Sequence, residues 1–381
     1  MFVDESFEPS PDHGWSREVR PVDGATIIPP TNMLAFPTCG VLDSTGTDLP
    51  EAAIYRTSDV GRLRRMMLPP KPAEGPVAHL PGTHLWGGQI FNHFGHFLTE
   101  SISRLWAAAD HPADSLVFVG RHKEMADLQQ WHRNFLTMAG IDLPVQLITE
   151  PTQVERLLVP GQGFGLGPIA RGTPEFRAFG HRLAEQIEPK GHDRIYISRT
   201  RQGKKGRALN EVQIEDNMHR NGYGIYYPER HSLTEQLAQY RKASHIVGLD
   251  SSAFHLAGLI ARPGQKIAII LRRNMSAYYN IQRQFEGMTG TSPDILNVLE
   301  GDWMPEKHKG ASRLSWGQLD HAALARALAE RGYIDSAGDW RLPTETQKEG
   351  AMQGLAKHMG NAPLKFVPAD KPIDQQMAGR H

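Results

Sequence analysis

Residues 245–271, HIVGLDSSAFHLAGLIARPGQKIAIIL, alternate between two short apolar runs and one helical pattern. The runs at 245–249 and 266–271 are only long enough for buried strands, whereas residues 251–261 between them have the composition of a helix. Two strands joined through a helix pair in parallel, with the helix packed on the sheet. This stretch therefore predicts an α/β fold.

The same alternation continues on both sides of this stretch. Further strands are predicted at 115–120, 145–150, 156–160, 194–199 and 222–228. Helices are predicted at 125–140 with Gly140 after the end, from Thr173-Pro174, from an Asn210 N-cap, from Ser232, and at 317–332. The chain is interrupted at 188–191, so two βα-rich halves predict two Rossmann-like domains facing a cleft.

The composition also suggests where each part begins and ends. Residues 1–80 are rich in proline and are expected to form an irregular arm leading into strands. We place the two domains at 81–188 and 189–335. Residues 336–381 are polar, are interrupted by Pro and Gly, and contain one weak helical stretch, so we expect a tail.

The overall composition excludes several classes of protein. The 381 residues include 42 basic and 42 acidic side chains, and 39% are hydrophobic, which argues against wholesale disorder and against a polyanion-coating protein. The single Cys39 excludes an intrachain disulfide framework and a Cys-based zinc cluster. Without a signal-peptide pattern or a long apolar run, the chain is expected to be cytoplasmic, with at most peripheral membrane contact.

The first cluster that suits chemistry is NHFGHFLTESISR, residues 92–104. In a helix that starts near Gly95, His96, Glu100 and Arg104 lie one turn apart on one face. An imidazole beside a carboxylate is one way to build a general base. Two alternatives stay open: a plain Glu100–Arg104 surface pair, and a metal site that also uses His93.

The second cluster is a basic loop. Residues 194–207 contain six basic side chains and no acidic one. Arg199 ends a predicted strand, where α/β sheets bind ligands, and Arg207 comes shortly before the helix that starts with Asn210-Glu211. Guanidinium groups in these places suit a diphosphate. The alternative is a solvated basic loop or a loose affinity for RNA.

The third cluster is GLDSSAFH, residues 248–255, where a strand runs through two serines into a helix. Exposed backbone N–H groups and serine hydroxyls at such a turn form an anion cradle. In the alternative interpretation, one of Ser251 and Ser252 is only an N-cap. Elsewhere, Ser232 and Glu235 form a Ser-x-x-Glu capping box, which we favour over a ligand contact for Glu235.

Taken together, these blocks resemble glycosyltransferase family 61. NHFGHFLTESISRLW is similar to the family's Asn-x-x-Gly-His-Trp-x-x-Glu segment, with Phe97 where Trp is common. IYISR…R…NE is similar to its Ser-Arg…Arg…Asn-Glu block, and residues 222–259 are similar to its C-terminal signature. The family usually has His-Gly-Ser where this chain has Asp250-Ser251-Ser252. The resemblance runs from about His84 to Leu271.

The resemblance implies a GT-B-like, inverting, metal-independent enzyme without a cofactor. It would move a hexose or pentose from a nucleotide-diphosphate donor, a UDP-sugar above all, to a glycan hydroxyl in surface or capsular polysaccharide synthesis. The 81–188 domain would hold the acceptor and the 189–335 domain the donor. No nucleic-acid partner is expected. Two other functions remain as alternatives: a non-catalytic nucleotide-sugar or glycan-binding subunit, and a His/Glu metal hydrolase.

The resemblance also implies roles for individual residues. Glu100 is the leading general base for the acceptor hydroxyl, and His96 orients it or takes that role itself. The residues expected to bind the nucleotide-sugar are Arg199, Arg207, Asn210, Glu211, Ser251, Ser252 and His255. Cationic groups and N–H dipoles would act on the leaving diphosphate, where charge develops during transfer. No metal ligand is assigned.

Overall fold

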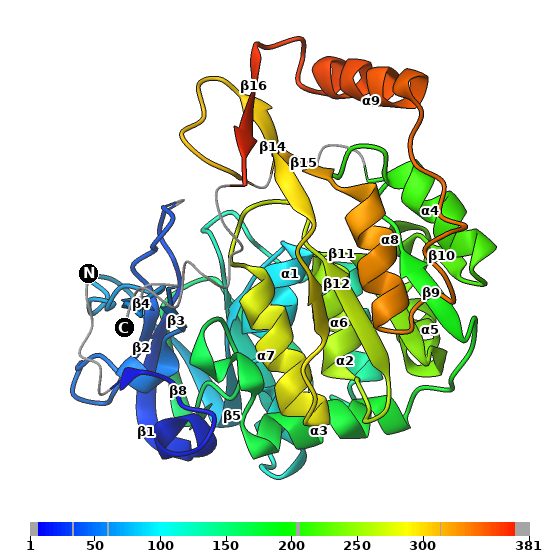
Figure 1. Ribbon diagram of the computed structural model, residues 1–381. Coiled ribbons are helices and arrows are strands. Elements are labelled where there is room, and N and C mark those ends of the chain that lie inside the picture. Colours follow the sequence, from blue (N-terminus) through cyan, green and yellow to red (C-terminus); the bar gives the residue numbers. More distant parts are fainter. Residues whose placement is uncertain (1–6, 33, 59–60, 203–205, 313, 370–381) are drawn as a thin grey trace. The chain divides into compact units, whose positions relative to one another are not determined.

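The computed structural model describes residues 7–32, 34–58, 61–202, 206–312 and 314–369 (Figure 1). The chain divides into two compact units. The first unit comprises residues 1–187, 255–261 and 283–290, and the second comprises 188–254, 262–282 and 291–381. The fold is mixed α/β with parallel pairing in both units, as the sequence predicts. The four-part division of the chain by function stays a prediction.

A six-stranded sheet in the order β2-β1-β8-β5-β6-β7 forms the centre of the first unit. Its strands are β1 (Val19–Ile28), β2 (Gly40–Leu42), β5 (Ala78–Ile90), β6 (Ser115–Gly120), β7 (Val145–Ile148) and β8 (Thr152–Pro160). Strands β8, β5, β6 and β7 are parallel, whereas β1 is antiparallel to β2 and β8. A separate hairpin joins β3 (Tyr55–Thr57) and β4 (Leu63–Arg65).

The first unit also has helices α1 (Phe94–His96), α2 (Gln130–Met138) and α3 (Pro174–Glu185). The α3 helix starts as its sequence predicts: Thr173 Oγ1 accepts a hydrogen bond from Phe176 N, and Pro174 takes the first helical position. Gly140 follows α2 with a φ of 71°, the left-handed conformation that ends a helix.

The N-terminal segment is more ordered than the sequence suggests. We expected an irregular arm leading into strands over residues 1–80, and the structure has a ten-residue strand, β1, that begins as early as Val19 and pairs along most of β8. In Figure 1 the blue β1 runs beside β8. The reason is burial, since Ala25 and Ile27 on β1 and Val41 on β2 belong to the buried core of this unit.

A five-stranded parallel sheet in the order β10-β9-β11-β12-β13 forms the centre of the second unit. Its strands are β9 (Arg194–Ile197), β10 (Gly224–Tyr226), β11 (His245–Leu249), β12 (Lys266–Ile270) and β13 (Asp294–Leu296). Strands β9, β11 and β12 are buried almost throughout, which explains why their sequences are continuous apolar runs. Its helices include α4 (Glu211–Arg220), α5 (Leu233–Lys242) and α8 (His321–Glu330).

Two helices are divided between the units. Helix α6 (Ser252–Leu259) passes from the second unit into the first after Phe254, and α7 (Tyr278–Thr289) does so after Gln282. His255 therefore belongs to the first unit although the serines before it belong to the second.

The C-terminal part differs from the expected tail. Strands β14 (Leu299–Pro305), β15 (Trp316–Leu319) and β16 (Leu364–Pro368) form an antiparallel sheet, and α9 (Glu345–His358) precedes β16. The expected weak helical stretch is α9, which buries only Leu355 fully, whereas strand β16 was not expected. The predicted helix at 317–332 also starts later than expected, because residues 316–319 pair with β14 and Asp320 caps α8.

None of the helices among the described residues is long and apolar enough to span a membrane.

Arg104 is an unusual feature of the first unit, because its side chain is a fully buried cation. Its Nη2 donates to the carbonyl oxygens of Glu51 at 2.8 Å and Ala53 at 2.7 Å, and its Nη1 donates to that of Pro160. Burial lowers the pKa of Arg104 to about 9, so the group is still a cation at neutral pH. Arg104 thus connects three separate segments of the first unit.

We expect Arg104→Ala to destabilise the protein strongly. It removes three hydrogen bonds from a cation to backbone carbonyls, two of them buried, at about 1–3 kcal/mol each, so the free energy of unfolding should fall by at least ~3 kcal/mol. Urea unfolding of the full chain measures this change. Arg133→Ala is the matched control, because Arg133 forms only an exposed pair with Asp127 and should cost less than ~1 kcal/mol. An equal loss of unfolding free energy in the two variants would contradict the role of Arg104 in connecting these segments.

Candidate active site

The segment from Asn92 to Trp106 is not one regular helix. After the single turn α1, residues Phe97–Ser101 form a π-helical turn, in which Ile102 N donates to Phe97 O across five residues. A 3₁₀ turn, Leu105–Ala109, follows. Single π-helical turns of this kind are frequent at functional sites. Here the turn ends at Ser101 and shifts the helical register between Glu100 and Arg104.

Glu100 is fully buried and has two side-chain partners. Arg56, from strand β3, donates from Nη2 to Glu100 Oε2 at 2.7 Å and from Nε to Oε1. His96 Nδ1 lies 2.9 Å from Glu100 Oε2. The carboxylate therefore accepts a forked guanidinium on one side and an imidazole on the other.

These contacts decide the protonation state of Glu100. Burial by itself raises the pKa of the carboxyl, but the Arg56 guanidinium and the hydrogen bonds from His96 and Arg56 outweigh burial and lower the pKa to about 2. Glu100 is consequently an anion over the whole physiological range. A carboxylate this acidic is a weak base.

The same contacts orient the ring of His96. A carboxylate only accepts and a guanidinium only donates, and Nδ1 lies closer to Glu100 Oε2 than to Arg56 Nη2, which is 3.3 Å away. The shorter, charge-assisted contact favours a proton on Nδ1, which makes Nε2 the free acceptor in the neutral ring. The side chain of His96 is 38% exposed, so a ligand can reach it.

One of the alternatives for this segment does not hold. The Glu100–Arg104 surface pair is wrong, because the π-helical turn breaks the register, and Arg104 instead binds the buried carbonyls described above. For the metal site with His93, the described ranges contain no group of three or more His, Cys, Asp or Glu side chains arranged to hold a metal ion. His93 instead packs its ring 5.0 Å from that of His96.

His255 also belongs to this unit. Its Nδ1 lies 2.8 Å from Gln284 Oε1, and Gln284 Nε2 donates to the carbonyl of His255 at 2.9 Å. Burial lowers the pKa of His255 to about 4, and the nearby His96 adds a smaller contribution in the same direction. His255 is thus a neutral imidazole at pH 7, in electrostatic contact with His96. Its assignment to nucleotide-sugar binding stays a prediction.

A second cluster lies in the second unit, at the carboxyl ends of β9, β11 and β12. Because these neighbouring strands are parallel, the residues that follow them meet at one edge of the sheet. They are Arg199 after β9, Asp250-Ser251 after β11, and Arg272-Arg273 shortly after β12.

The carbonyl of Gly206 connects two of these arginines. It accepts from Arg199 Nη2 at 3.2 Å and from Arg272 Nη1 at 3.1 Å. Arg272 also donates from Nε to the carbonyl of Asp250 at 2.9 Å and from its backbone N to Asp250 Oδ1 at 3.0 Å. Arg273 Nε lies 3.8 Å from Asp250 Oδ2, which is too long for a hydrogen bond. Asp250, where the family usually has His, thus holds this pair of arginines.

Several donors in this cluster have no hydrogen-bond partner among the described residues. Buried polar groups in proteins are nearly always hydrogen-bonded, so unpaired donors need an explanation. Among the described residues, the buried side-chain atoms without a hydrogen-bond partner include Arg199 Nε, Arg273 Nε and Nη1, and Ser251 Oγ. Ser251 precedes α6, but its hydroxyl makes no capping bond. Unpaired cationic donors grouped at the edge of a parallel sheet suit an anion.

Nearby carboxyl groups balance part of this positive charge. Glu211 Oε1 accepts from Arg199 N at 2.8 Å, and burial raises the pKa of Glu211 to about 7. Glu211 therefore carries only part of a charge at neutral pH and fixes the backbone of Arg199. Asp302 also interacts electrostatically with Arg273. Burial and then Arg272 lower the pKa of Arg199 to about 10, which leaves it a cation.

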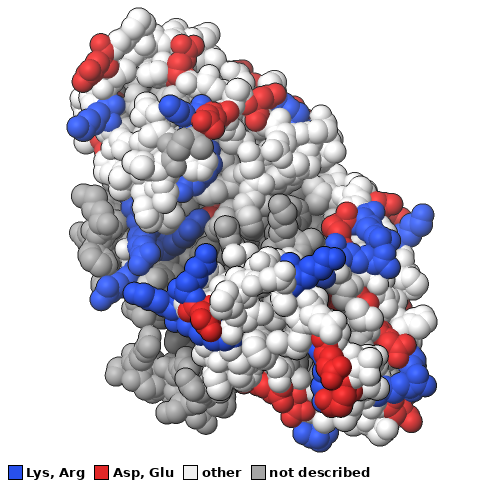
Figure 2. Space-filling model, turned by 90° about the horizontal axis from the view of Figure 1, so that it is seen from above, with Lys and Arg blue, Asp and Glu red and all other residues white. Residues whose placement is uncertain are grey.

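The basic residues of 194–207 do not act as one patch. Arg194 packs on the ring of Tyr223 and Arg201 on that of Tyr227, while Lys204 and Lys205 lie outside the described residues. Arg207 donates from Nε to the carbonyl of Gln202 at 2.9 Å. Figure 2 shows one face of the molecule, where basic side chains gather in one area and mix with acidic ones elsewhere.

Two helix-start predictions have different outcomes. The capping box of Ser232 and Glu235 is confirmed, because each side chain bonds to the other's backbone N–H. Asn210 does precede α4, but its side chain makes no cap. Its φ is 57°, and its Nδ2 donates to the carbonyl of Gln347 at 3.0 Å. The left-handed backbone explains the difference, since a capping residue normally has an extended conformation.

Three residues of the two clusters were missed from the sequence. Arg272 and Arg273 directly follow the predicted strand 266–271, so the rule that selected Arg199 also selects them. Arg56 has no such signal. It lies on a three-residue strand 44 positions before Glu100, and only the folded chain brings the two together.

Comparison with known proteins supports the family resemblance. Residues 94–268 match the family model described as Glycosyltransferase 61, so this part of the chain belongs to glycosyltransferase family 61. The match includes His96, Glu100, Arg199 and Ser251 and ends before Arg272. No curated protein has a significant sequence match to the chain. The match indicates glycosyltransferase activity, which uses a sugar donor and an acceptor.

The buried ion pair predicts how stability depends on pH. The pKa of Glu100 in the folded protein is about 2, below its ordinary value of 4.5. Its stabilising contribution is therefore present above pH ~4.5 and is lost as the pH falls toward ~2, by about 3 kcal/mol in total. We expect the difference in unfolding free energy between wild type and Glu100→Gln to shrink over this range.

Arg56→Met is the matched comparison for this measurement. Without the guanidinium, burial should dominate and raise the pKa of Glu100, so acidification should stabilise this variant relative to wild type. Denaturant titrations at several pH values measure both slopes. Parallel pH profiles for wild type and both variants would show that Arg56 and Glu100 are not coupled.

Proposed function

We propose that the protein is an inverting glycosyltransferase that transfers a sugar from a nucleoside-diphosphate donor to a hydroxyl group of a glycan. The observation that carries this proposal is the set of unpaired buried donors on Arg199, Ser251 and Arg273, at the carboxyl edge of the parallel sheet. In a glycosyltransferase, the anion that such donors suit is the diphosphate of the donor.

His96 acts as the general base in this proposal. Its Nε2 takes the proton of the acceptor hydroxyl, whose oxygen attacks the anomeric carbon of the sugar. Glu100 accepts from Nδ1 and stabilises the imidazolium that forms, as the carboxylate of a catalytic triad does. The bond between the anomeric carbon and the diphosphate oxygen breaks, and the diphosphate leaves with the electron pair. Attack from the opposite side inverts the anomeric centre.

The arginines stabilise the leaving group. Negative charge grows on the diphosphate as the glycosidic bond breaks, and fixed cationic donors favour that charge. Because Arg199, Arg272 and Arg273 supply positive charge themselves, we propose that transfer does not depend on a divalent metal. The other predicted contacts of the nucleotide-sugar remain predictions: Arg207, Asn210, Glu211, Ser252 and His255.

The wider setting belongs to the same proposal. We propose a GT-B-like arrangement of two Rossmann-like domains facing a cleft, with the acceptor on 81–188 and the donor on 189–335. A UDP-sugar as donor, a hexose or pentose as the transferred sugar, and a role in surface or capsular polysaccharide synthesis stay predictions, as does a cytoplasmic location.

Donor binding tests the arginine cluster. We expect Arg273→Ala to weaken the binding of the preferred nucleoside diphosphate at least tenfold, about 1.4 kcal/mol, because it removes two unpaired donors. A thermal-shift screen with UDP, GDP and CMP first identifies that nucleotide. Calorimetry then compares the variants, with the exposed Arg262→Ala as control. Unchanged affinity in Arg273→Ala would place the diphosphate elsewhere.

Turnover tests the base. We expect His96→Gln and Glu100→Gln to bind the nucleotide as the wild type does, with His96→Gln lowering kcat by about 100-fold or more. Glu100→Gln should lower kcat less, because it keeps a side chain beside Nδ1 but loses the charge. Wild-type turnover in His96→Gln would refute its role. Nucleotide binding without transfer across a broad acceptor panel would favour a non-catalytic binding subunit.

A further inference from the structure

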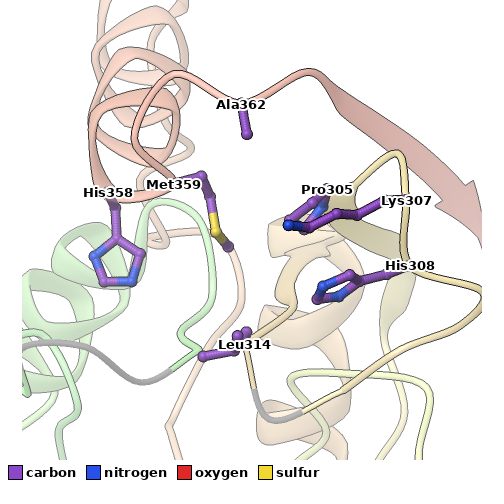
Figure 3. A pocket seen from close by; sticks show the side chains of 7 residues that line it. All are labelled: Pro305, Lys307, His308, Leu314, His358, Met359 and Ala362. Carbon is purple, nitrogen blue, oxygen red and sulfur yellow. The ribbon is translucent and has the colours of Figure 1, made fainter.

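A pocket of about 390 Å³ opens in the second unit, between the segment that follows β14 and the end of α9. Its lining residues are Pro305, Lys307, His308, Leu314, His358, Met359 and Ala362 (Figure 3). All of them lie beyond residue 268, where the family match ends. Neither the match nor the proposed chemistry gives this pocket a role.

The lining suits a flat ring with polar edges. Leu314 and Met359 supply apolar walls, and the imidazoles of His308 and His358 add flat faces that stack on aromatic rings. Figure 3 shows Lys307 and His308 pointing from one side toward Met359, which extends from the other. The lining contains no Asp or Glu, so negative charge on a ligand meets no repulsion.

A chain of ring contacts leads from the pocket to Arg207. The ring of His358 packs on that of Trp316 at 5.2 Å, and the guanidinium of Arg207 lies 5.5 Å from the Trp316 ring. The backbone also connects these groups, since Gly317 N donates to the carbonyl of Arg207 at 3.0 Å. Arg207 therefore lies next to the wall that carries His358.

From Arg207 the connection continues to the arginine cluster. The preceding residue is Gly206, whose carbonyl accepts from both Arg199 and Arg272. A Cβ atom at Gly317 would also come within 2.1 Å of the Arg272 carbonyl, so β15 packs directly against that segment. Positive groups thus extend from the edge of the pocket to the carboxyl ends of β9 and β12.

We propose that this pocket binds the nucleobase of the donor, with the diphosphate running past Arg207 to Arg199, Arg272 and Arg273. The inference rests on the proposed function, because it assigns the base end of the same nucleotide. A nucleoside diphosphate is the ligand class that joins a flat heterocycle to two phosphates, which matches a flat-walled pocket followed by arginines. The C-terminal sheet and α9 then determine which base the enzyme accepts.

Calorimetry on the full chain tests this inference with two probes, the preferred nucleoside diphosphate and inorganic pyrophosphate. Pyrophosphate has no base, so it reports the arginine cluster alone. Ala362→Trp fills the pocket, because Ala362 points into it (Figure 3). The matched control is Gln353→Trp, which places the same bulk on an exposed position of α9 outside the lining. Leu314→Trp fills the pocket from the opposite side and decides the question if Ala362→Trp does not fold.

We expect the nucleoside diphosphate to bind wild type at least about tenfold more tightly than pyrophosphate does, since the base adds contacts. The filling variants should remove this advantage and leave pyrophosphate affinity within about twofold, while Gln353→Trp changes neither. The inference is overturned if the filling variants still bind the nucleoside diphosphate more tightly than pyrophosphate. It is also overturned if wild type binds the two probes equally well. Either result leaves the anion site intact. If wild type binds neither probe, the proposed function itself fails.

Discussion

Parallel pairing of β9, β11 and β12 is the constraint on which the second unit depends. Each strand is only four or five residues long and almost fully buried. Because the three strands run in the same direction, the chain leaves the sheet at the same edge each time. The residues that follow are thereby gathered from three distant parts of the sequence. Arg199, Ser251 and Arg272 owe their proximity to this register rather than to any local pattern.

The buried guanidinium groups at this edge need hydrogen-bond partners from the protein or from a ligand. A buried charge is tolerated only when partners replace the water that it has lost. The backbone carbonyls of Gly206 and Asp250 accept two hydrogen bonds from the Arg272 side chain, and that of Gly206 accepts one from Arg199. The Asp250 carboxylate lies beside Arg273. Arg199 Nε, Ser251 Oγ and two donors of Arg273 are left without a hydrogen-bond partner among the described residues. A ligand with several anionic oxygens completes this set of hydrogen bonds better than one carboxylate could.

The sequence predicts features that depend on neighbouring residues better than features that depend on residues far apart in the chain. Strand 245–249 is predicted to the residue because a continuous apolar run has one stable place in a parallel sheet. The π-helical turn at 97–101 is not predicted, since the residues of this turn fit an α-helix equally well, and the expected position of Arg104 fails with it. Arg56 cannot be found at all, because its partner depends on tertiary packing. Arg272 could have been found by the strand-end rule.

Two buried glutamates show how the same side chain acquires opposite properties. Glu100 and Glu211 both lose their contact with water, and that loss alone raises the pKa of a carboxyl group. Glu100 has a guanidinium and an imidazole on its oxygens and becomes a permanent anion, whereas Glu211 receives mainly a backbone N–H and titrates near neutrality. A permanent anion is suited to holding a histidine in one tautomer and to stabilising its protonated form. The environment of Glu100 is therefore the reason why we propose the Nε2 of His96 as the proton acceptor, and not the carboxylate that the sequence favours.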